Sequence, residues 1–227
     1  MRYAITGTVM QSLEVLLEPG ESMFTESGGM AWMSDGIEMN TNTKGGLMAG
    51  LGRALAGESL FMTTYTSRIS GAVITFTPEA PGVVLPMQLA PNQVIIAQKD
   101  AFMCATSSVK LEMHFRKKLG AGLFGGEGFI LEKLTGPGMA FLEIPGEIKE
   151  YNLVPNQLLK VDPGHIAAFE PTVSYDIEMM KGLANIAFSG EGLFLATLRG
   201  PGKVWLQTMP ISNLANKIKQ YIPTKSS

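Results

Sequence analysis

The sequence has very little cysteine and no long hydrophobic run. Cys104 is the single cysteine among 227 residues, so an internal disulfide is excluded, as is usual in a reducing compartment. No stretch approaches the ~20 apolar residues that a membrane-spanning helix needs. The start, "MRYAITGTVMQSLE", is interrupted by polar residues and lacks the apolar core of a signal peptide. The sequence therefore predicts a cytoplasmic protein.

Excess positive charge is also missing. The chain has 18 Lys and Arg against 20 Asp and Glu, which gives a formal net charge of −2. No summed positive field attracts a polyanion, so nucleic acid is not an expected partner.

Residue patterns for catalysis are absent as well. The two histidines, His114 and His165, are 51 residues apart, which matches no zinc-binding spacing with Cys104. Neither a G-x-S-x-G elbow, nor an H-E-x-x-H helix, nor a Walker A loop occurs. The stretch 120–125 fits G-x-G-x-x-G, but a dinucleotide site needs a helix directly after this motif, and only ten residues separate Gly125 from Gly136. We therefore interpret the stretch as a hairpin tip. We therefore predict no catalytic residues, no cofactor, no metal and no enzymatic activity.

Glycine, in contrast, is abundant, with 26 residues, and it marks an internal repeat. The stretch "GGEGFILEKLTGPG" at 125–138 returns as "SGEGLFLATLRGPG" at 189–202, with eight identities in fourteen positions. A more divergent copy begins with "GESLF" at 57–61. The motifs "LEPGE", "LAPNQ" and "LVPNQ" precede these copies in the same order. We therefore predict one compact domain, 1–227, made of three tandem repeats at about 13–84, 85–148 and 149–210.

Each repeat has the pattern of β-strands. In "VKLEMHF" at 109–115 and "TVSYDIE" at 172–178, apolar and polar residues alternate with a period of two, which indicates strands with one buried face. Pro-Gly, Gly-Pro and Pro-Asn pairs between them are typical of tight turns. The predicted fold class is all-β: three β-sandwich or double-stranded β-helix-like repeats fused with pseudo-threefold symmetry. A short helix is predicted at 212–222, with Ser212 as N-cap.

Two sets of equivalent residues are candidate sites. A threefold arrangement could bring Glu58, Glu127 and Glu191 together as ligands for a hard cation. In the alternative interpretation, each glutamate caps or solvates its own turn.

The second set lies in the connectors before each Gly-Glu motif, which are apolar although loops usually favour polar residues. These tips are either core, covered by one another, or an exposed patch for self-association or a membrane interface. The candidate tip residues are Leu47, Met48, Leu51, Leu123, Phe124, Leu183, Ile186 and Phe188.

These motifs together resemble the altered-inheritance-of-mitochondria 24 family of mitochondrial biogenesis proteins, in its bacterial and archaeal branch. The likeness extends over residues 3–222, and its most specific parts are 124–138 and the copy at 188–202. It implies an all-β fold similar to the tryptophan RNA-binding attenuator, repeated within one chain. It supplies no catalytic residues, because prokaryotic members lack an established activity and the mitochondrial relative is associated with inner-membrane organisation.

We therefore predict a non-enzymatic, homo-oligomeric β-domain that contacts a protein partner or a membrane surface through the apolar tips. A role in membrane organisation or stress is compatible with the resemblance. The alternative is a small-molecule or RNA-binding module resembling the attenuator, although fold alone does not carry function.

Overall fold

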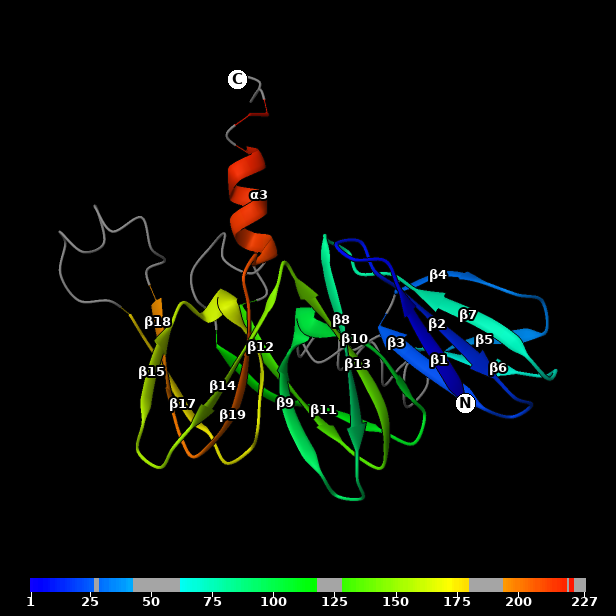
Figure 1. Ribbon diagram of the computed structural model, residues 1–227, viewed down its shortest axis with the longest axis horizontal. Coiled ribbons are helices and arrows are strands. Elements are labelled where there is room, and N and C mark those ends of the chain that lie inside the picture. Colours follow the sequence, from blue (N-terminus) through cyan, green and yellow to red (C-terminus); the bar gives the residue numbers. More distant parts are fainter. Residues whose placement is uncertain (27–28, 43–61, 118–127, 180–193, 220, 223–227) are drawn as a thin grey trace. The chain divides into compact units, whose positions relative to one another are not determined.

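The structure is a computed structural model of the 227-residue chain (Figure 1). It describes residues 1–26, 29–42, 62–117, 128–179, 194–219 and 221–222. Nearly all elements in these ranges are β-strands, which confirms the predicted all-β class. They form four sheets, called A to D below.

Sheets A and B carry the N-terminal strands. Sheet A has the order β1-β2-β7-β4 and sheet B the order β5-β6-β3-β10-β13-β8. The strands of sheet A are β1 (Arg2–Thr6), β2 (Ser12–Leu17), β7 (Ala72–Phe76) and β4 (Met30–Met33). Those of sheet B are β5 (Ile37–Asn42), β6 (Met62–Ser67), β3 (Ser22–Glu26), β10 (Phe102–Thr106), β13 (Gly138–Pro145) and β8 (Gly82–Leu89).

Sheets C and D carry most of the later strands. Sheet C has the order β11-β12-β9-β16-β19-β14 and sheet D the order β15-β18-β17. The strands of sheet C are β11 (Lys110–Lys117), β12 (Phe129–Thr135), β9 (Val94–Gln98), β16 (Ile166–Phe169), β19 (Gly202–Gln207) and β14 (Ile148–Leu153). Those of sheet D are β15 (Leu158–Val161), β18 (Phe194–Arg199) and β17 (Ser174–Met179).

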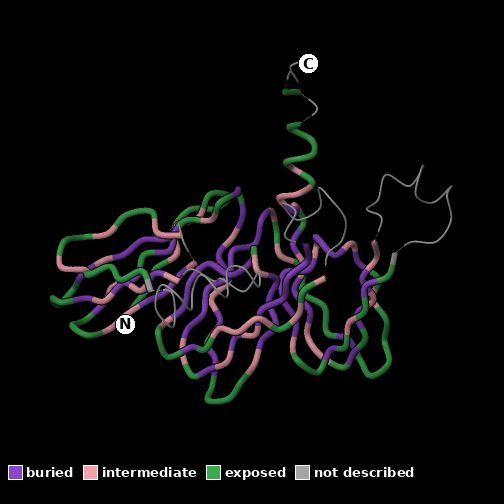
Figure 2. Tube along the Cα trace, turned by 180° about the vertical axis from the view of Figure 1, so that it is seen from behind, coloured by how far each residue is buried: buried purple, intermediate pink, exposed green. Residues whose placement is uncertain are grey.

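Alternation of apolar and polar residues explains why these segments are strands with one buried face. In β2, Leu13, Val15 and Leu17 are all 0% exposed, whereas Glu14 between them is exposed. The buried residues join a core cluster that includes Phe76 of β7, Tyr65 of β6 and Phe141 of β13. Burial of each such side chain contributes about 1.5–3 kcal/mol. Figure 2 shows buried segments along the inner strands and exposed ones at turns.

The repeated Gly-Pro-Gly stretches are turns between consecutive strands, as the sequence indicates. One joins β12 to β13 and the other β18 to β19, and each contains a cis peptide bond, Gly136–Pro137 or Gly200–Pro201. A side chain cannot replace the first glycine, because a Cβ atom would lie 2.3 Å from the Ala90 carbonyl oxygen at 136 and 2.5 Å from that of Val154 at 200. Asn92 and Asn156, also 64 residues apart, both have positive φ angles, 63° and 64°.

The chain divides into two compact units. The first contains Met1–Val94, Asp100–Met113 and Lys133–Ile144, and the second Ile95–Lys99, His114–Glu132 and Pro145–Ser227. The number of repeats, their boundaries within a single domain and the pseudo-threefold axis remain predictions.

The predicted C-terminal helix is present as α3 (Ile211–Lys219). It begins one residue earlier than expected, because the Pro210 carbonyl accepts the first hydrogen bonds from the Asn213 and Leu214 N–H groups. Ser212 therefore lies in the first turn and is not the N-cap. Tyr221 and Ile222, which the prediction included, lie in a turn and a bend after the helix. No residue of α3 is buried.

Candidate functional site

Strands β4, β10 and β16 occupy equivalent places in sheets A, B and C. Each pairs antiparallel with a later strand of its own sheet: β4 with β7, β10 with β13 and β16 with β19. Each of these pairings has a register shift at the same point. The shift falls between Met30 and Trp32, between Phe102 and Cys104, and between Ile166 and Ala168. Trp32, Cys104 and Ala168 are therefore equivalent positions.

The three strands differ in what lies on their other side. β10 also pairs with β3, and β16 also pairs with β9, so both strands are inside a sheet. Among the described strands, β4 has only β7 as a neighbour and ends sheet A. With respect to the described strands, its outer N–H and C=O groups form a free sheet edge, which is a template for pairing with another chain.

The exposure of the three equivalent side chains follows from this difference in neighbouring strands. Cys104 and Ala168 are 0% exposed, whereas Trp32 is 55% exposed. Burial raises the pKa of the Cys104 thiol well above its usual value, with a further contribution from Glu143, so this cysteine is not an activated nucleophile. A tryptophan at a free edge is instead typical of binding surfaces, where aromatic residues are enriched.

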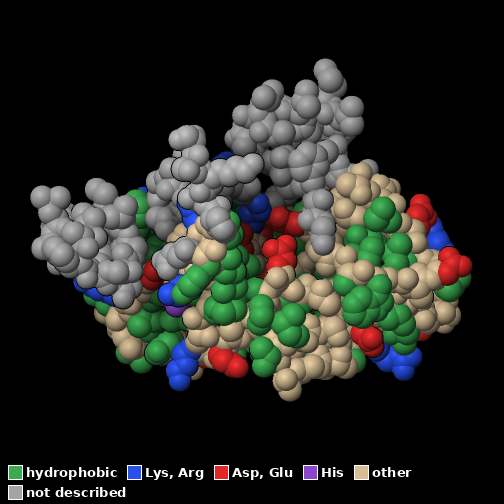
Figure 3. Space-filling view, turned by 90° about the horizontal axis from the view of Figure 1, so that it is seen from above, with side chains coloured by type: hydrophobic (Ala, Val, Ile, Leu, Met, Phe, Trp, Pro, Cys, Tyr) green, Lys and Arg blue, Asp and Glu red, His purple; other side chains and the backbone are tan. Residues whose placement is uncertain are grey.

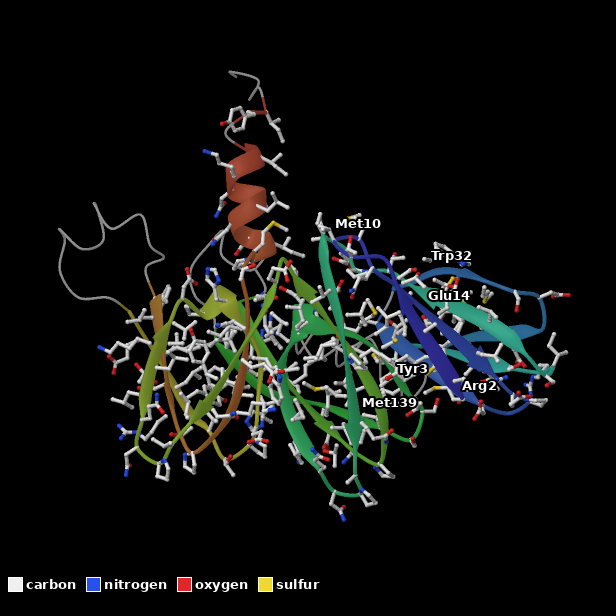
Figure 4. The ribbon with its side chains drawn as sticks, viewed as in Figure 1. Arg2, Tyr3, Met10, Glu14, Trp32 and Met139 are labelled. Carbon is white, nitrogen blue, oxygen red and sulfur yellow. The ribbon has the colours of Figure 1, made fainter. Side chains whose placement is uncertain are left out.

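Trp32 belongs to a row of residues across the outer face of sheet A. The strand registers place Ala4 opposite Glu14, Glu14 opposite Thr75, and Thr75 opposite Trp32. Residues directly opposite one another in an antiparallel sheet share a face. Figure 4 shows Glu14 and Trp32 on their strands, with Arg2 on β1. We call Arg2, Ala4, Glu14 and Trp32 the sheet A surface, since all four are exposed.

Thr75 lies beneath this surface. Its side chain is 0% exposed, and its Oγ1 atom has no hydrogen-bond partner within the described part of the chain. Equivalent positions carry Phe141 and Trp205, which pair with Cys104 and Ala168. The hydroxyl is therefore a polar atom at a position where the other sheets have an aromatic ring.

Sheet D has a free edge of its own at β15. This strand pairs with β18 through Leu158, Leu159, Lys160 and Val161, and no other described strand lies beside it. Leu158 is 49% exposed and Lys160 is exposed. We call Leu158–Val161 the β15 edge.

A buried carboxyl group in β13 has a strongly raised pKa. Glu143 is 8% exposed, and its Oε2 atom accepts a 2.7 Å hydrogen bond from the Glu79 backbone N–H. Burial, with a smaller contribution from the nearby charges of Glu79 and Asp100, raises the pKa of Glu143 to about 8 despite the lowering effect of this hydrogen bond. The group is therefore mostly protonated at neutral pH.

The equivalent residue in β19 is an amide. Gln207 donates a 2.7 Å hydrogen bond from Nε2 to the Gly164 carbonyl. Since an uncharged group occupies this place in both strands, we interpret Glu143 as structural. In the described ranges no three His, Cys, Asp or Glu residues are placed to hold a metal ion.

The site residues predicted from the sequence lie outside the described residues. This holds for the eight apolar tip residues, for the G-x-G-x-x-G stretch and for Glu58, Glu127 and Glu191. Of the histidines, His114 is exposed, and His165 lies in the short η3 helix (Pro163–His165) with Nδ1 2.7 Å from the Gln207 carbonyl oxygen.

Sequence reasoning missed Trp32. The signal that could have found it is the alignment of "MAWM" at 30–33 with "FMCA" at 102–105. A large aromatic residue there replaces a small one.

The described part of the face drawn in Figure 3 has no dominant charge. Figure 3 shows one face on which hydrophobic side chains alternate with both acidic and basic ones. Within the described ranges, no helix is both long and apolar enough to cross a membrane.

Comparison with known proteins agrees with the resemblance inferred from the motifs. The chain matches the family described as mitochondrial biogenesis AIM24 over residues 3–209. It is 30% identical to an uncharacterised protein of Streptococcus pyogenes serotype M6, over 100% of this chain and 93% of that protein.

Among solved structures, a crystal structure of a Streptococcus pyogenes protein has the same fold. Its TM-score is 0.80 at 24% identity, and the match covers 97% of this chain and 99% of the other. By sequence match over nearly its whole length, the chain belongs to the mitochondrial biogenesis AIM24 family.

Proposed function

We propose that this protein is a non-enzymatic β-domain that acts in the cytoplasm by binding a protein partner through the sheet A surface and the free edge of β4. The observation that carries this proposal is the exposure of Trp32 on an edge strand, at a position that is covered in both equivalent strands. Tryptophan is among the residues that contribute most binding energy at interfaces.

The chemistry of the surface suits strand addition by a protein segment. The edge offers backbone N–H and C=O groups to an added strand, and the exposed indole offers an apolar contact beside it. Arg2 and Glu14, both exposed on the same face, add one charge of each sign. A membrane surface is the competing occupant, which the vesicle measurement below separates from a protein.

Site-specific photo-crosslinking tests the proposal. A benzophenone amino acid at position 32, in the chain produced at its normal level in its own cells, should give discrete protein adducts after illumination. The matched control is position 39, because Met39 is also 55% exposed and also lies on an edge strand, β5. Equal adducts from both positions, or none from position 32, would contradict the proposal.

Flotation with vesicles of phosphatidylglycerol or phosphatidylcholine addresses the membrane alternative. We expect the purified protein to stay at the bottom of the gradient with both lipids. Flotation that is lost in Trp32→Asp, with the circular dichroism spectrum unchanged, would replace the protein partner by a lipid surface.

A further inference from the structure

The identity of the partner can be inferred from two strand pairings inside the chain. In the first unit, β10 pairs antiparallel with β3, with Ala105 opposite Phe24 and Thr106 opposite Met23. The Thr25 hydroxyl donates a 2.6 Å hydrogen bond to the Met103 carbonyl across this pair, and the Phe24 and Phe102 rings are 5.7 Å apart. This pairing joins β5, β6 and β3 to β10, β13 and β8 in one sheet.

The second unit contains the same pairing. Here β16 pairs antiparallel with β9, with Ala168 opposite Ala97 and Phe169 opposite Ile96. Phe169 is 64 residues after Ala105, and Ile96 is 72 residues after Phe24. The same numbers of residues separate the equivalent residues on either side, so the two junctions have the same strand register. All four of these residues of the second junction are at most 2% exposed.

The two free edges, β4 and β15, correspond to the two strands of this junction, but each lacks the partner strand that the junction would give it. β4 is equivalent to β10 and β16, because its pairing with β7 has the same register shift as the pairings of β10 with β13 and of β16 with β19. β15 is equivalent to β3, because Leu158 pairs with Arg199 as Ser22 pairs with Thr66, at the ends of the corresponding strands. It is equivalent to β9 by sequence, because "LVPNQ" precedes β15 as "LAPNQ" precedes β9. Neither edge has a second strand beside it among the described strands.

We infer that the partner of β4 is β15 of a second copy of this chain, paired antiparallel in the register of the two internal junctions. This inference rests on the proposed function and names its partner. The register places Met33 opposite Lys160 and Trp32 opposite Val161. It joins the four strands of sheet A to the three of sheet D. Because the two surfaces are different, the contact is head-to-tail and produces a closed ring or a filament.

The charges on the two edges support this partner. Lysine on an edge strand protects it from unspecific pairing, and Lys160 stands where the internal junctions have Phe24 and Ile96. In the inferred register, Met33 lies opposite Lys160, and Asp35 lies two residues further on, in the turn that follows β4. Asp35 is the acidic residue nearest in sequence to this end of β4, and its charge is opposite to that of Lys160. Lys160 therefore disfavours the pairing of β15 with most strand edges but is compatible with its pairing with β4.

Disulfide trapping between two single-cysteine chains tests the register. The background is Cys104→Ala, since the equivalent position in β16 is Ala168 and the exchange removes the native thiol. Mixing the Met33→Cys chain with the Lys160→Cys chain under mild oxidation should give at least ten times more disulfide dimer than either chain alone. The control mixture contains Met39→Cys and Lys160→Cys and should give little dimer.

Two results would overturn the inference. One is equal dimer yield from the matched and the control mixtures. The other is a disulfide that forms only within a chain carrying both Met33→Cys and Lys160→Cys, because the two edges then meet inside one molecule.

Charge reversal provides an independent measurement on chains without new cysteines. Sedimentation velocity should show association that depends on concentration in the wild type. Lys160→Glu and Asp35→Lys should each weaken it about tenfold, and the double variant should restore it. Wild type that stays monomeric at all concentrations, or a double variant as weak as the single ones, would contradict the inferred pairing.

These outcomes are separable from those of the proposed function. Adducts from position 32 to a different protein, together with a monomeric wild type, would refute the second copy and leave the proposed function standing. If position 32 gives no protein adduct at all, both statements fail.

Discussion

Strands β4 and β16 have equivalent pairing partners, the same register shift and opposite surroundings. Ala168 in β16 lies between two strands and is 0% exposed, whereas Trp32 in β4 lies at a sheet edge and is 55% exposed. The comparison shows that the neighbouring strand and the layer above it determine which side chain fits. A covered position has room for alanine or cysteine, and an open one tolerates tryptophan.

The largest effect is expected when the tryptophan of β4 is moved into β16. Ala168→Trp should lower the free energy of unfolding by about 3 kcal/mol, because the closely packed interior must move to admit the ring. Urea denaturation followed by circular dichroism measures the difference. Ala168→Cys is the control, because β10 has Cys104 at the equivalent covered position, and wild-type stability in Ala168→Trp would show that the position is not packed as described.

The next comparison concerns Glu143 in β13 and Gln207 in β19. Since the folded-state pKa of Glu143 is raised from 4.5 to about 8, the folded protein holds a proton that the unfolded chain releases above pH 4.5. Stability is therefore complete below about pH 4.5 and falls as pH rises towards 8.

Glu143→Gln should remove this loss, because the amide is neutral at every pH. We expect the variant to be about 2 kcal/mol more stable than the wild type at pH 9 and nearly equal to it at pH 5. Urea midpoints measured from pH 5 to pH 9 give the difference. The reverse exchange, Gln207→Glu, should create a similar pH dependence in β19. Parallel pH curves for wild type and Glu143→Gln would contradict the shifted pKa.

A smaller loss of stability, equal at the two positions, is expected when the turn residues Asn92 and Asn156 are replaced. Asn92 and Asn156 have positive φ angles, which cost about 1 kcal/mol more for alanine than for asparagine or glycine. Asn92→Ala and Asn156→Ala should each destabilise by that amount, and the glycine variants should stay near wild type. Thermal unfolding is the measurement, and clearly unequal losses would show that the two turns differ.

The smallest effect on stability is expected at Trp32 itself. Trp32→Cys should change the free energy of unfolding by no more than about 0.5 kcal/mol, because the side chain is exposed. In the Cys104→Ala background, and at a protein concentration at which the chain is monomeric, the new thiol should react with a disulfide reagent at least ~100 times faster than Cys104 does in the wild type. Similar rates would mean that position 32 is covered.

Several features of the fold could be predicted from the sequence. Alternation in 109–115 and 172–178 indicated strands, and β11 and β17 occupy these segments. The repeated Gly-Pro-Gly stretches indicated turns, which is correct because only glycine fits against the carbonyls of Ala90 and Val154. A helix near the C-terminus was also expected, although its first residue was not.

The candidate site was not among these features. The sequence drew attention to apolar connectors, which lie outside the described residues, and passed over Trp32. Alternation shows which face of a strand is buried, but it does not show which strand lies beside it. Phe24 and Ala105 are 81 positions apart in the chain, and no local pattern marks them as neighbours across a sheet.

The sequence by itself determined the all-β class, the positions of several turns and strands and, through its repeated motifs, the family. The class, the turns and the strands depend on local physics, namely the period of side chains along a strand and the φ angles that glycine, proline and asparagine adopt. Only the tertiary structure decided that Trp32 and Lys160 lie at open edges, that Cys104 and Ala168 are covered, and that Glu143 is mostly protonated at neutral pH. Burial and edge exposure depend on which distant segments pack together, and that is a property of the whole fold.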